Sequence, residues 1–322
     1  GRMTVVGGPR RADNYVWWEL EGPPGRGWAV ENFLRVVIGE STPTSGSEAP
    51  RCEKTEQAYP GVEYCLRDGG ETHVISIQLD DPHVRFETVL AEDVQSVNTN
   101  ERELIREMAA RYQGTAAAIT ADYSGSGHGP EGLTIKNGVR LDGIANGDGD
   151  FNAVNRSSLV ISQALLDGGS LPIVADITRL KDDRQEIDLS RFYNAAGGGP
   201  QVMFESAWEW SRGLPNARNT GCRSLNLSDI INGECFVDTG DWDAPGKRWT
   251  AIGITQDNQL IWVVAPYRLI RNTLEAFQVR EAIKMDGGGS SQLWYAGREV
   301  VNSSDNPDRR LASGLLVFYL QS

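Results

Sequence analysis

Hydrophobic and polar positions alternate along much of the chain, and this alternation predicts many short strands. Residues 74–79 (Val-Ile-Ser-Ile-Gln-Leu) and residues 85–90 (Arg-Phe-Glu-Thr-Val-Leu) place apolar side chains mainly on one face, as a half-buried strand does. Shorter apolar runs bounded by turn residues predict further strands. These runs are residues 116–120, 159–161, 201–204, 250–254, 260–265 and 315–320.

Helical spacing is less frequent. Leu104, Ile105, Met108 and Ala109 recur at the interval of one helix face, which predicts an amphipathic helix over residues 101–112. A second helix is expected to begin in residues 273–279. Strands therefore dominate, and we expect an α+β, sheet-rich domain.

The first part of the chain has a different pattern. Short strands are predicted at residues 4–6, 15–20 and 27–30, with turns at residues 7–9 (Gly-Gly-Pro) and 22–25 (Gly-Pro-Pro-Gly). A stretch rich in Ser, Thr, Pro and Gly follows and is typical of a linker. We therefore expect a small all-β segment at 1–38, a linker at 39–50, and a main domain at 51–322.

Three motifs of the small segment resemble the second half of a bacterial Src-homology-3-like domain. They are Val-Val-Gly-Gly-Pro, Tyr-x-Trp-Trp-x-Leu and Gly-Trp-Ala-x-x-x-Phe-Leu, within residues 3–34. Such modules commonly tether secreted enzymes to cell-wall material, so the resemblance implies a place at the cell envelope. Half a barrel also leaves an open strand edge, and self-association through this incomplete barrel is one expected way of covering it.

Composition and charge narrow the class of protein. The 322 residues are 39% hydrophobic with nine Trp, which is typical of a folded globular chain. The formal charge of −13 repels nucleic-acid backbones and anionic lipid, so no nucleic-acid partner is expected. No apolar run has the roughly 18 residues that a membrane span requires. The chain also opens without a secretion signal, as a mature or trimmed product would.

The four cysteines form two local pairs with equal spacing. Cys52 and Cys65 are 13 positions apart, as are Cys222 and Cys235. Two hairpin-closing disulfides are the first interpretation and favour an extracellular compartment. Four unrelated thiols or a zinc site are the alternatives, although neither pair has CxxC spacing.

The most informative stretch for chemistry is Asp286-Gly287-Gly288-Gly289-Ser290-Ser291. Three consecutive glycines after an acidic residue let a ligand approach backbone N–H groups closely, and the two hydroxyls add donors. Such a nest suits a phosphate or a sugar hydroxyl. The alternative is a glycine-rich turn with no ligand.

This stretch, with Gly297, Val301-Asn302 and Arg310 after it, resembles the signature of the phosphodiester glycosidase family. Upstream segments resemble other motifs of the family in order and spacing over residues 73–320. These segments are 117–123 (Ala-Ala-Ile-Thr-Ala-Asp-Tyr), 132–138 (Gly-Leu-Thr-Ile-x-Asn-Gly), 198–200 (Gly-Gly-Pro) and 248–254 (Arg-x-Thr-Ala-Ile-Gly-Ile).

The resemblance implies hydrolysis of the bond between a sugar anomeric carbon and phosphate. Thr120 stands where the family usually carries Asn. A hydroxyl replaces one amide hydrogen bond but not the paired donor and acceptor, so either Asp122 takes over this duty or the activity has changed.

Carboxylates and arginines are the expected reacting and binding groups. Asp286 and Asp122 are the predicted carboxylate pair, and His128 is a candidate for proton transfer. Arg248 and Arg310 are predicted to hold phosphate through their guanidinium forks, with Arg309 as a neighbouring substitute. The other predicted substrate contacts are Thr120, Gly199, Gly287, Gly288, Gly289, Ser290, Ser291 and Asn302.

No cofactor is expected. Asn146-Gly-Asp148-Gly-Asp150 has oxygen ligands at calcium-like spacing, but it lacks the rest of an EF-hand loop, and a polar turn is favoured over a structural calcium site.

The expected function is a secreted hydrolase that acts on a sugar phosphodiester or polysaccharide. The alternatives are a non-catalytic glycan-binding or self-assembling extracellular subunit, and a conventional glycoside hydrolase.

Overall fold

The structure is a computed structural model, and it divides into two compact units. They are Gly1–Glu48 and Ala49–Ser322, and each is considered by itself. The described residues are 4–12, 15–22, 25–30, 52–95, 100–124, 129–141, 156–162, 174–179, 181–182, 185–186, 192–208, 229–231, 234–236 and 241–320.

The first unit contains a three-stranded antiparallel sheet. Its strands are β1 (Thr4–Ala12), β2 (Tyr15–Gly22) and β3 (Gly25–Val30), in the order β1-β2-β3. The turn predicted at residues 7–9 is wrong, because these residues continue β1. Register irregularities on both sides of Gly7 accommodate the Gly-Gly-Pro sequence within the strand. The likeness to a Src-homology-3-like module stays a prediction.

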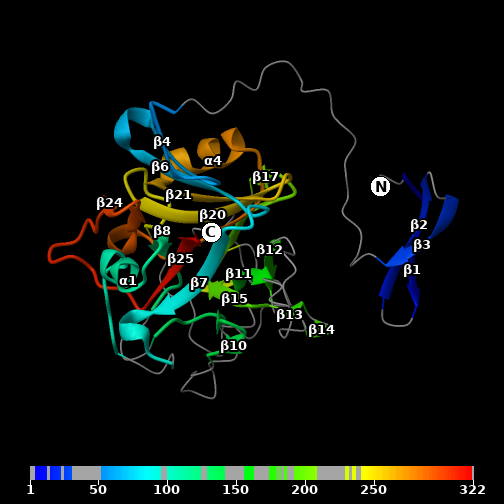
Figure 1. Cartoon of the computed structure of the whole chain (residues 1–322), viewed down its shortest axis with the longest axis horizontal. Coiled ribbons are helices and arrows are strands. Elements are labelled where there is room, and N and C mark those ends of the chain that lie inside the picture. Colours follow the sequence, from blue (N-terminus) through cyan, green and yellow to red (C-terminus); the bar gives the residue numbers. More distant parts are fainter. Residues whose placement is uncertain are drawn as a thin grey trace. The chain divides into compact units, whose positions relative to one another are not determined.

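The second unit is built mainly on an eight-stranded sheet (Figure 1). Its order is β17-β16-β22-β20-β21-β6-β5-β4, and all its pairs are antiparallel. The bounds are β4 (Lys54–Tyr59), β5 (Val62–Arg67), β6 (Thr72–Gln78), β16 (Gln201–Phe204), β17 (Ala207–Trp208), β20 (Arg248–Thr255), β21 (Gln259–Pro266) and β22 (Val279–Lys284).

Two five-stranded sheets accompany it. One has the order β24-β23-β8-β25-β7 and consists of β7 (Val84–Leu90), β8 (Thr115–Thr120), β23 (Leu293–Tyr295), β24 (Arg298–Val301) and β25 (Ser313–Tyr319). The other has the order β10-β9-β15-β11-β12 and consists of β9 (Thr134–Lys136), β10 (Val139–Arg140), β11 (Ser157–Ser162), β12 (Val174–Arg179) and β15 (Asn194–Gly197). The described residues also contain two short strand pairs, β13 (Lys181–Asp182) with β14 (Gln185–Glu186) and β18 (Asp229–Ile231) with β19 (Glu234–Phe236).

Central strands such as β20 and β21 are buried on both faces because their sheet lies between other layers. On β21, Trp262 and Val264 belong to the core shared by the three large sheets, whereas Ile261 and Val263 pack toward helix α4 (Tyr267–Ala276). Helix α1 (Ile105–Arg111) covers the outer face of the sheet containing β8 and β25. The sheet-rich α+β prediction is confirmed (Figure 1).

The observed bounds of both helices differ from the predicted ones. The first begins at Ile105 instead of residue 101, because Glu103 forms a β-bridge with Leu311 and holds the preceding residues extended. The second prediction is wrong in position. Helix α4 ends at Ala276, and Val279 already begins β22 as the antiparallel partner of Thr255, because strand pairing overrides the local helical pattern.

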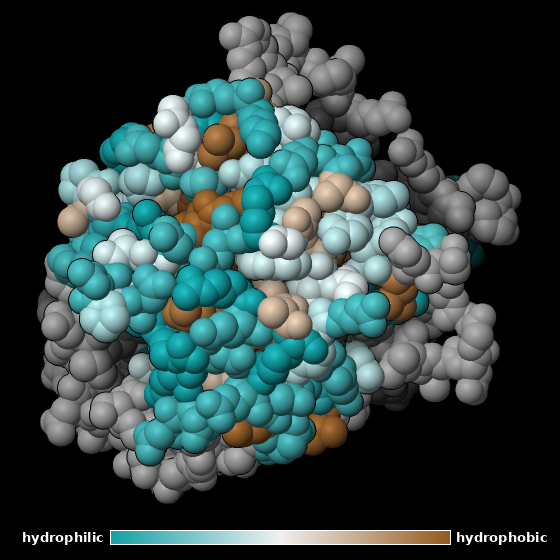
Figure 2. All heavy atoms as spheres, turned by 60° about the vertical axis from the view of Figure 1, so that its left-hand side comes forward, coloured by the Kyte–Doolittle hydropathy of each residue, from teal (hydrophilic) through white to brown (hydrophobic). Residues whose placement is uncertain are grey.

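The glycine turn after Asp286 forms a short 3-10 helix, η6 (Gly288–Ser290). The described residues contain two other short 3-10 helices, η2 (Asp68–Gly70) and η3 (Ala91–Asp93). The face that carries α1 and β24 is mainly hydrophilic, with small separate hydrophobic spots (Figure 2). No helix in the described part of the chain is long and apolar enough to span a membrane.

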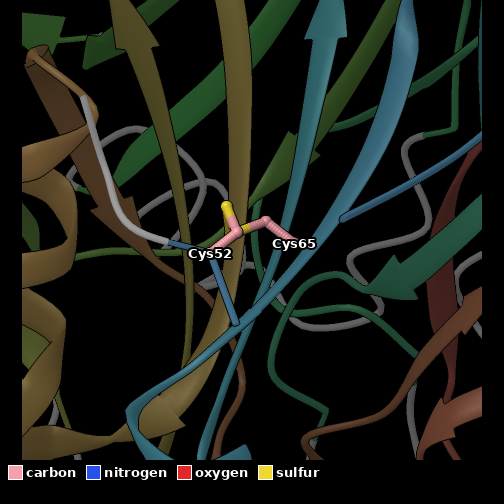
Figure 3. The surroundings of a disulfide bond; sticks show 2 residues. All are labelled: Cys52 and Cys65. Carbon is pink, nitrogen blue, oxygen red and sulfur yellow. A yellow bond between two sulfur atoms is a disulfide. The ribbon is translucent and has the colours of Figure 1, made fainter. Parts of the chain in front are cut away.

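A disulfide joins Cys52 to Cys65 at the β4–β5 hairpin, with 5.4 Å between the two Cα atoms (Figure 3). This confirms the predicted bridge for the first cysteine pair. The second pair lies outside the residues whose side chains are described, so its bridge stays a prediction.

Replacing both cysteines of this bridge by Ala is expected to lower the free energy of unfolding by about 3 kcal/mol, because the open chain regains the entropy of a short loop. Chemical denaturation of the double variant measures the loss. Thr55→Ala, an exposed change opposite Cys65 on the same hairpin, is the control and should alter stability by less than about 0.5 kcal/mol. A double variant as stable as the native chain would contradict the prediction.

Candidate functional site

The Asp286–Ser291 loop lies where strands from two sheets meet. Strand β22 ends at Lys284, and Met285 donates its N–H to Thr250 O on β20 at 2.9 Å. Asp286 donates its N–H to Ala121 O, just after β8, at 3.1 Å. The loop is therefore fixed between the large sheet and the sheet containing β8.

Buried hydroxyls hold the far end of the loop. Thr120 Oγ1 donates to Ser290 O at 2.5 Å and accepts the N–H of Gln292 at 3.0 Å. Thr250 Oγ1 donates to Ser291 Oγ at 3.0 Å. Thr120 and Ser291 are fully buried, so these predicted substrate contacts bond to protein groups and fix the shape of the loop.

Each of the three glycines disfavours a side chain, Gly288 by its backbone conformation and the other two by lack of space. Gly288 has φ of +62°, in the left-handed region. A Cβ on Gly287 would lie 3.1 Å from Arg248 O and 3.3 Å from Lys284 Nζ, and a Cβ on Gly289 would overlap the Asp305 carboxylate. The turn therefore brings bare backbone close to several charged side chains.

Asp286 stands at the start of this turn. Its Oδ1 accepts the N–H of Gly287 at 2.7 Å. Burial raises the pKa of its carboxyl, while Lys284, hydrogen bonds from Ser290 and Gly287, and the charge of Arg309 act in the opposite direction. A carboxylate with a raised pKa and part of its surface exposed is suited to proton transfer.

Lys284, at the end of β22, is buried, with 2% of its surface exposed. Its Nζ donates to Tyr123 Oη at 2.8 Å and to Met285 O at 3.0 Å. The same ammonium lies 3.9 Å from the ring centre of Trp242 and 5.3 Å from that of Trp249. Burial lowers its pKa to about 7, partly opposed by Asp286.

The second predicted carboxylate has a different environment. Asp122 is almost fully buried, and its two oxygens accept the N–H groups of Tyr123, at 2.8 Å, and of Gly132. Burial raises its pKa to about 7, while the charge of Arg156 and the two backbone hydrogen bonds lower it. These contacts attach the chain after β8 to the segment that leads into β9.

Tyr123 connects these groups. Its hydroxyl donates to Gly199 O at 2.7 Å, and its ring stacks on Trp242 with 5.4 Å between ring centres. Burial raises its pKa well above 10, and the charges of Asp286 and Asp122 raise it further. Tyr123 is therefore a neutral phenol within range of both carboxylates.

Gly199 contributes through its backbone. It precedes a cis peptide bond to Pro200, and its N–H donates to Lys284 O at 2.9 Å. The residue therefore joins the end of β22 to the Tyr123 hydroxyl.

The predicted arginines are not equivalent. Arg248 lies beside the glycine turn, and its Nη1 donates to Asn302 O at 2.9 Å. Arg310 instead pairs with Glu107 of α1 at 2.6 Å. Its neighbour Arg309 is the one whose charge lowers the pKa of Asp286, although its Nε also pairs with Asp305 at 2.6 Å.

Sequence reasoning missed three groups around Asp286. Lys284 and Trp242 were not singled out, and neither was Arg156, whose guanidinium lies 5.5 Å from the ring centre of Tyr123. A Lys at the end of a buried strand, two residues before Asp286, was the available signal. No local sequence pattern indicates Trp242 or Arg156, because only the folding of the chain brings them close to the site.

Two sets of predicted residues lie outside the part of the chain that the structure describes. His128 falls in residues 125–128, and the calcium-like segment falls in residues 142–150. Among the described residues, no group of three or more His, Cys, Asp or Glu side chains is placed to hold a metal ion.

Comparison with solved structures shows a shared fold. The catalytic domain of zebrafish N-acetylglucosamine-1-phosphodiester alpha-N-acetylglucosaminidase, in a form auto-inhibited by its pro-peptide, is 15% identical with a TM-score of 0.55, covering 84% of this chain and 87% of that one. A hypothetical protein from Synechocystis is 12% identical with a TM-score of 0.52, covering 85% of this chain and 64% of that one. This chain thus spans slightly less than two thirds of the Synechocystis structure. No curated protein matches the sequence significantly.

The fold is therefore shared with both of these structures. A profile of the phosphodiester glycosidase family matches residues 113–318, and the chain belongs to this family. The matched residues include β8, the Asp286–Ser291 loop and β25 up to Phe318, so the resemblance carried by the motifs is confirmed.

Proposed function

We propose that this chain hydrolyses the bond between a sugar anomeric carbon and phosphate, as a secreted enzyme acting on a glycan or cell-envelope phosphodiester. The observation that carries the proposal is the bare glycine turn after Asp286, where the side chains of two lysines approach. Lys284 Nζ lies 3.3 Å from the position of a Cβ on Gly287, and Lys247 Cε lies 3.5 Å from that of a Cβ on Gly288. Backbone donors and cations around a bare turn suit a phosphate group.

In the proposed reaction, the anomeric carbon binds beside Asp286 and the phosphate lies over the turn toward Arg248. The carbon–oxygen bond breaks, and the phosphate leaves with the electron pair. Water bonds to the carbon, gives one proton to Asp286, and keeps the other as the new sugar hydroxyl. The proton then passes from Asp286 to the phosphate monoester, which restores the carboxylate. The oxocarbenium-like charge that develops is stabilised by the same carboxylate.

Several features support the proposed substrate and place of action. The family includes an enzyme whose name specifies a sugar 1-phosphodiester as substrate. The disulfide at Cys52 and Cys65 favours an oxidising compartment. The three-stranded sheet of the first unit is proposed as the module that holds the enzyme at the cell envelope.

The test is release of reducing sugar and phosphomonoester from a panel of sugar 1-phosphodiesters, with N-acetylglucosamine compounds first. The matched control panel contains the same sugars as glycosides without phosphate. Turnover restricted to the phosphodiesters supports the proposal. Turnover of both panels indicates a conventional glycoside hydrolase, and no turnover by correctly folded protein leaves the non-catalytic glycan-binding alternative.

A further inference from the structure

We propose that Lys284 is a positioning residue that keeps Asp286 ionised, acting through its charge rather than through a direct ion pair. The inference deepens the proposed function, because it rests on Asp286 as the reacting carboxylate. It assigns a role to a buried cation that no motif of the sequence marked.

The glycine turn brings both groups to one residue. Lys284 is the last residue of β22, and Asp286, two positions later, accepts the N–H of Gly287 through its Oδ1 at 2.7 Å. Lys284 Nζ also lies 3.3 Å from the position of a Cβ on Gly287. The ammonium is therefore beside the turn, and a side chain at position 287 would press against it.

The hydrogen bonds of Lys284 leave its charge available. An ammonium has three N–H donors, and two of them reach Tyr123 Oη and Met285 O, which are both neutral acceptors. Within the described residues, no carboxylate forms an ion pair with Lys284. Because the charge is not cancelled by a contact, it acts on Asp286, whose pKa it lowers and whose own charge raises the pKa of Lys284.

An aromatic enclosure strengthens this action. The rings of Trp242, Tyr123 and Trp249 have their centres 3.9, 4.8 and 5.3 Å from Lys284 Nζ. Ring faces stabilise a cation without neutralising it, and they exclude water that would screen its field. Inside this enclosure, water therefore screens the attraction between Lys284 and Asp286 less than it would on an exposed surface.

Other charged and titratable groups among the described residues also act on the pair. Arg309, from the segment after β24, is the second cation that lowers the pKa of Asp286. Arg156, next to β11, acts on Lys284 and lowers its pKa. Tyr123 stays neutral, since burial raises its pKa well above 10. Lys284 contributes more than Arg309, whose Nε already pairs with Asp305.

The experiment follows the carboxyl carbon of Asp286 by ¹³C nuclear magnetic resonance during a pH titration of the full chain. In Lys284→Met the midpoint of Asp286 should rise by about one pH unit or more, because an opposing cation typically shifts a carboxyl by one to three units. Lys284→Arg, which keeps the charge, should restore most of the native midpoint. Arg309→Gln is the matched control and should give a smaller rise.

An unchanged midpoint in folded Lys284→Met overturns the inference, as does a rise in Lys284→Arg equal to that in Lys284→Met. If Lys284→Met does not fold, Lys284→Gln replaces it and is judged by the same outcomes. The titration needs no substrate, so it stands even if the activity panel fails. Where activity is found, the acid limb of the kcat/KM profile should move with the measured midpoint.

Discussion

Asp286→Asn is expected to lower kcat on a sugar 1-phosphodiester by a factor of roughly 10² to 10⁴, the range typical for loss of a positioned proton-transfer group. The amide keeps the size of the side chain and the acceptor for Gly287 N–H, which now lies at 2.7 Å. It loses the charge that supports the anomeric carbon and the ability to take a proton from water. Steady-state release of phosphomonoester measures the loss.

The same variant should be at least as stable as the native chain near neutral pH. Burial raises the pKa of Asp286, so its stability contribution is present below the unfolded pKa and is lost as the pH rises through the folded pKa. The neutral amide avoids that loss. Asp308→Asn, a partly exposed carboxylate 3.4 Å from Arg106, is the control and should change kcat by less than about twofold. Full activity in Asp286→Asn would remove Asp286 from the mechanism.

Asp122→Ala is expected to lower the free energy of unfolding by about 3 kcal/mol, because it leaves the N–H groups of Tyr123 and Gly132 without their acceptors in a buried place. A Cβ added to Gly132 or to Gly197 would lie within 2.9 Å of Asp122 Oδ2, so the carboxylate packs directly against the backbones of these two glycines. Urea denaturation followed by tryptophan fluorescence measures the change.

This penalty should also depend on pH. Burial raises the pKa of Asp122 from 3.8 to about 7. Its stability contribution is therefore full below the unfolded value and declines as the pH rises toward 7, so the penalty of Asp122→Ala should be larger at about pH 5 than at about pH 8. Asp80→Ala, at an exposed position, is the control for general effects of charge. A pH-independent penalty would show that Asp122 is ionised throughout.

Much of the fold was predictable because the core lies between layers. A strand covered on both faces gives a continuous apolar run, as in residues 260–265, and such runs mark strands well. The helix after it was misplaced, because the pairing of Val279 with Thr255 depends on a distant strand. Local pattern does not report such pairing.

The candidate site was predictable to the extent that it lies in one continuous motif. The turn from Asp286 to Ser291 was found from its glycines, whereas the neighbours of Asp286 come from several segments. Arg310 illustrates the limit. It has the residue type and position expected of a phosphate contact, yet it pairs with Glu107 on α1. Which of two adjacent arginines faces the site depends on packing against a helix that is remote in sequence.

The Cys52–Cys65 bridge has a mechanical consequence. Strand β4 is the outermost strand of its sheet and the first strand of the second unit, so tension from the preceding chain would tend to peel it away residue by residue. The covalent bond carries that load from Cys52 directly into β5, which is paired on both sides. A domain held at one end against shear would thus resist unzipping from its edge.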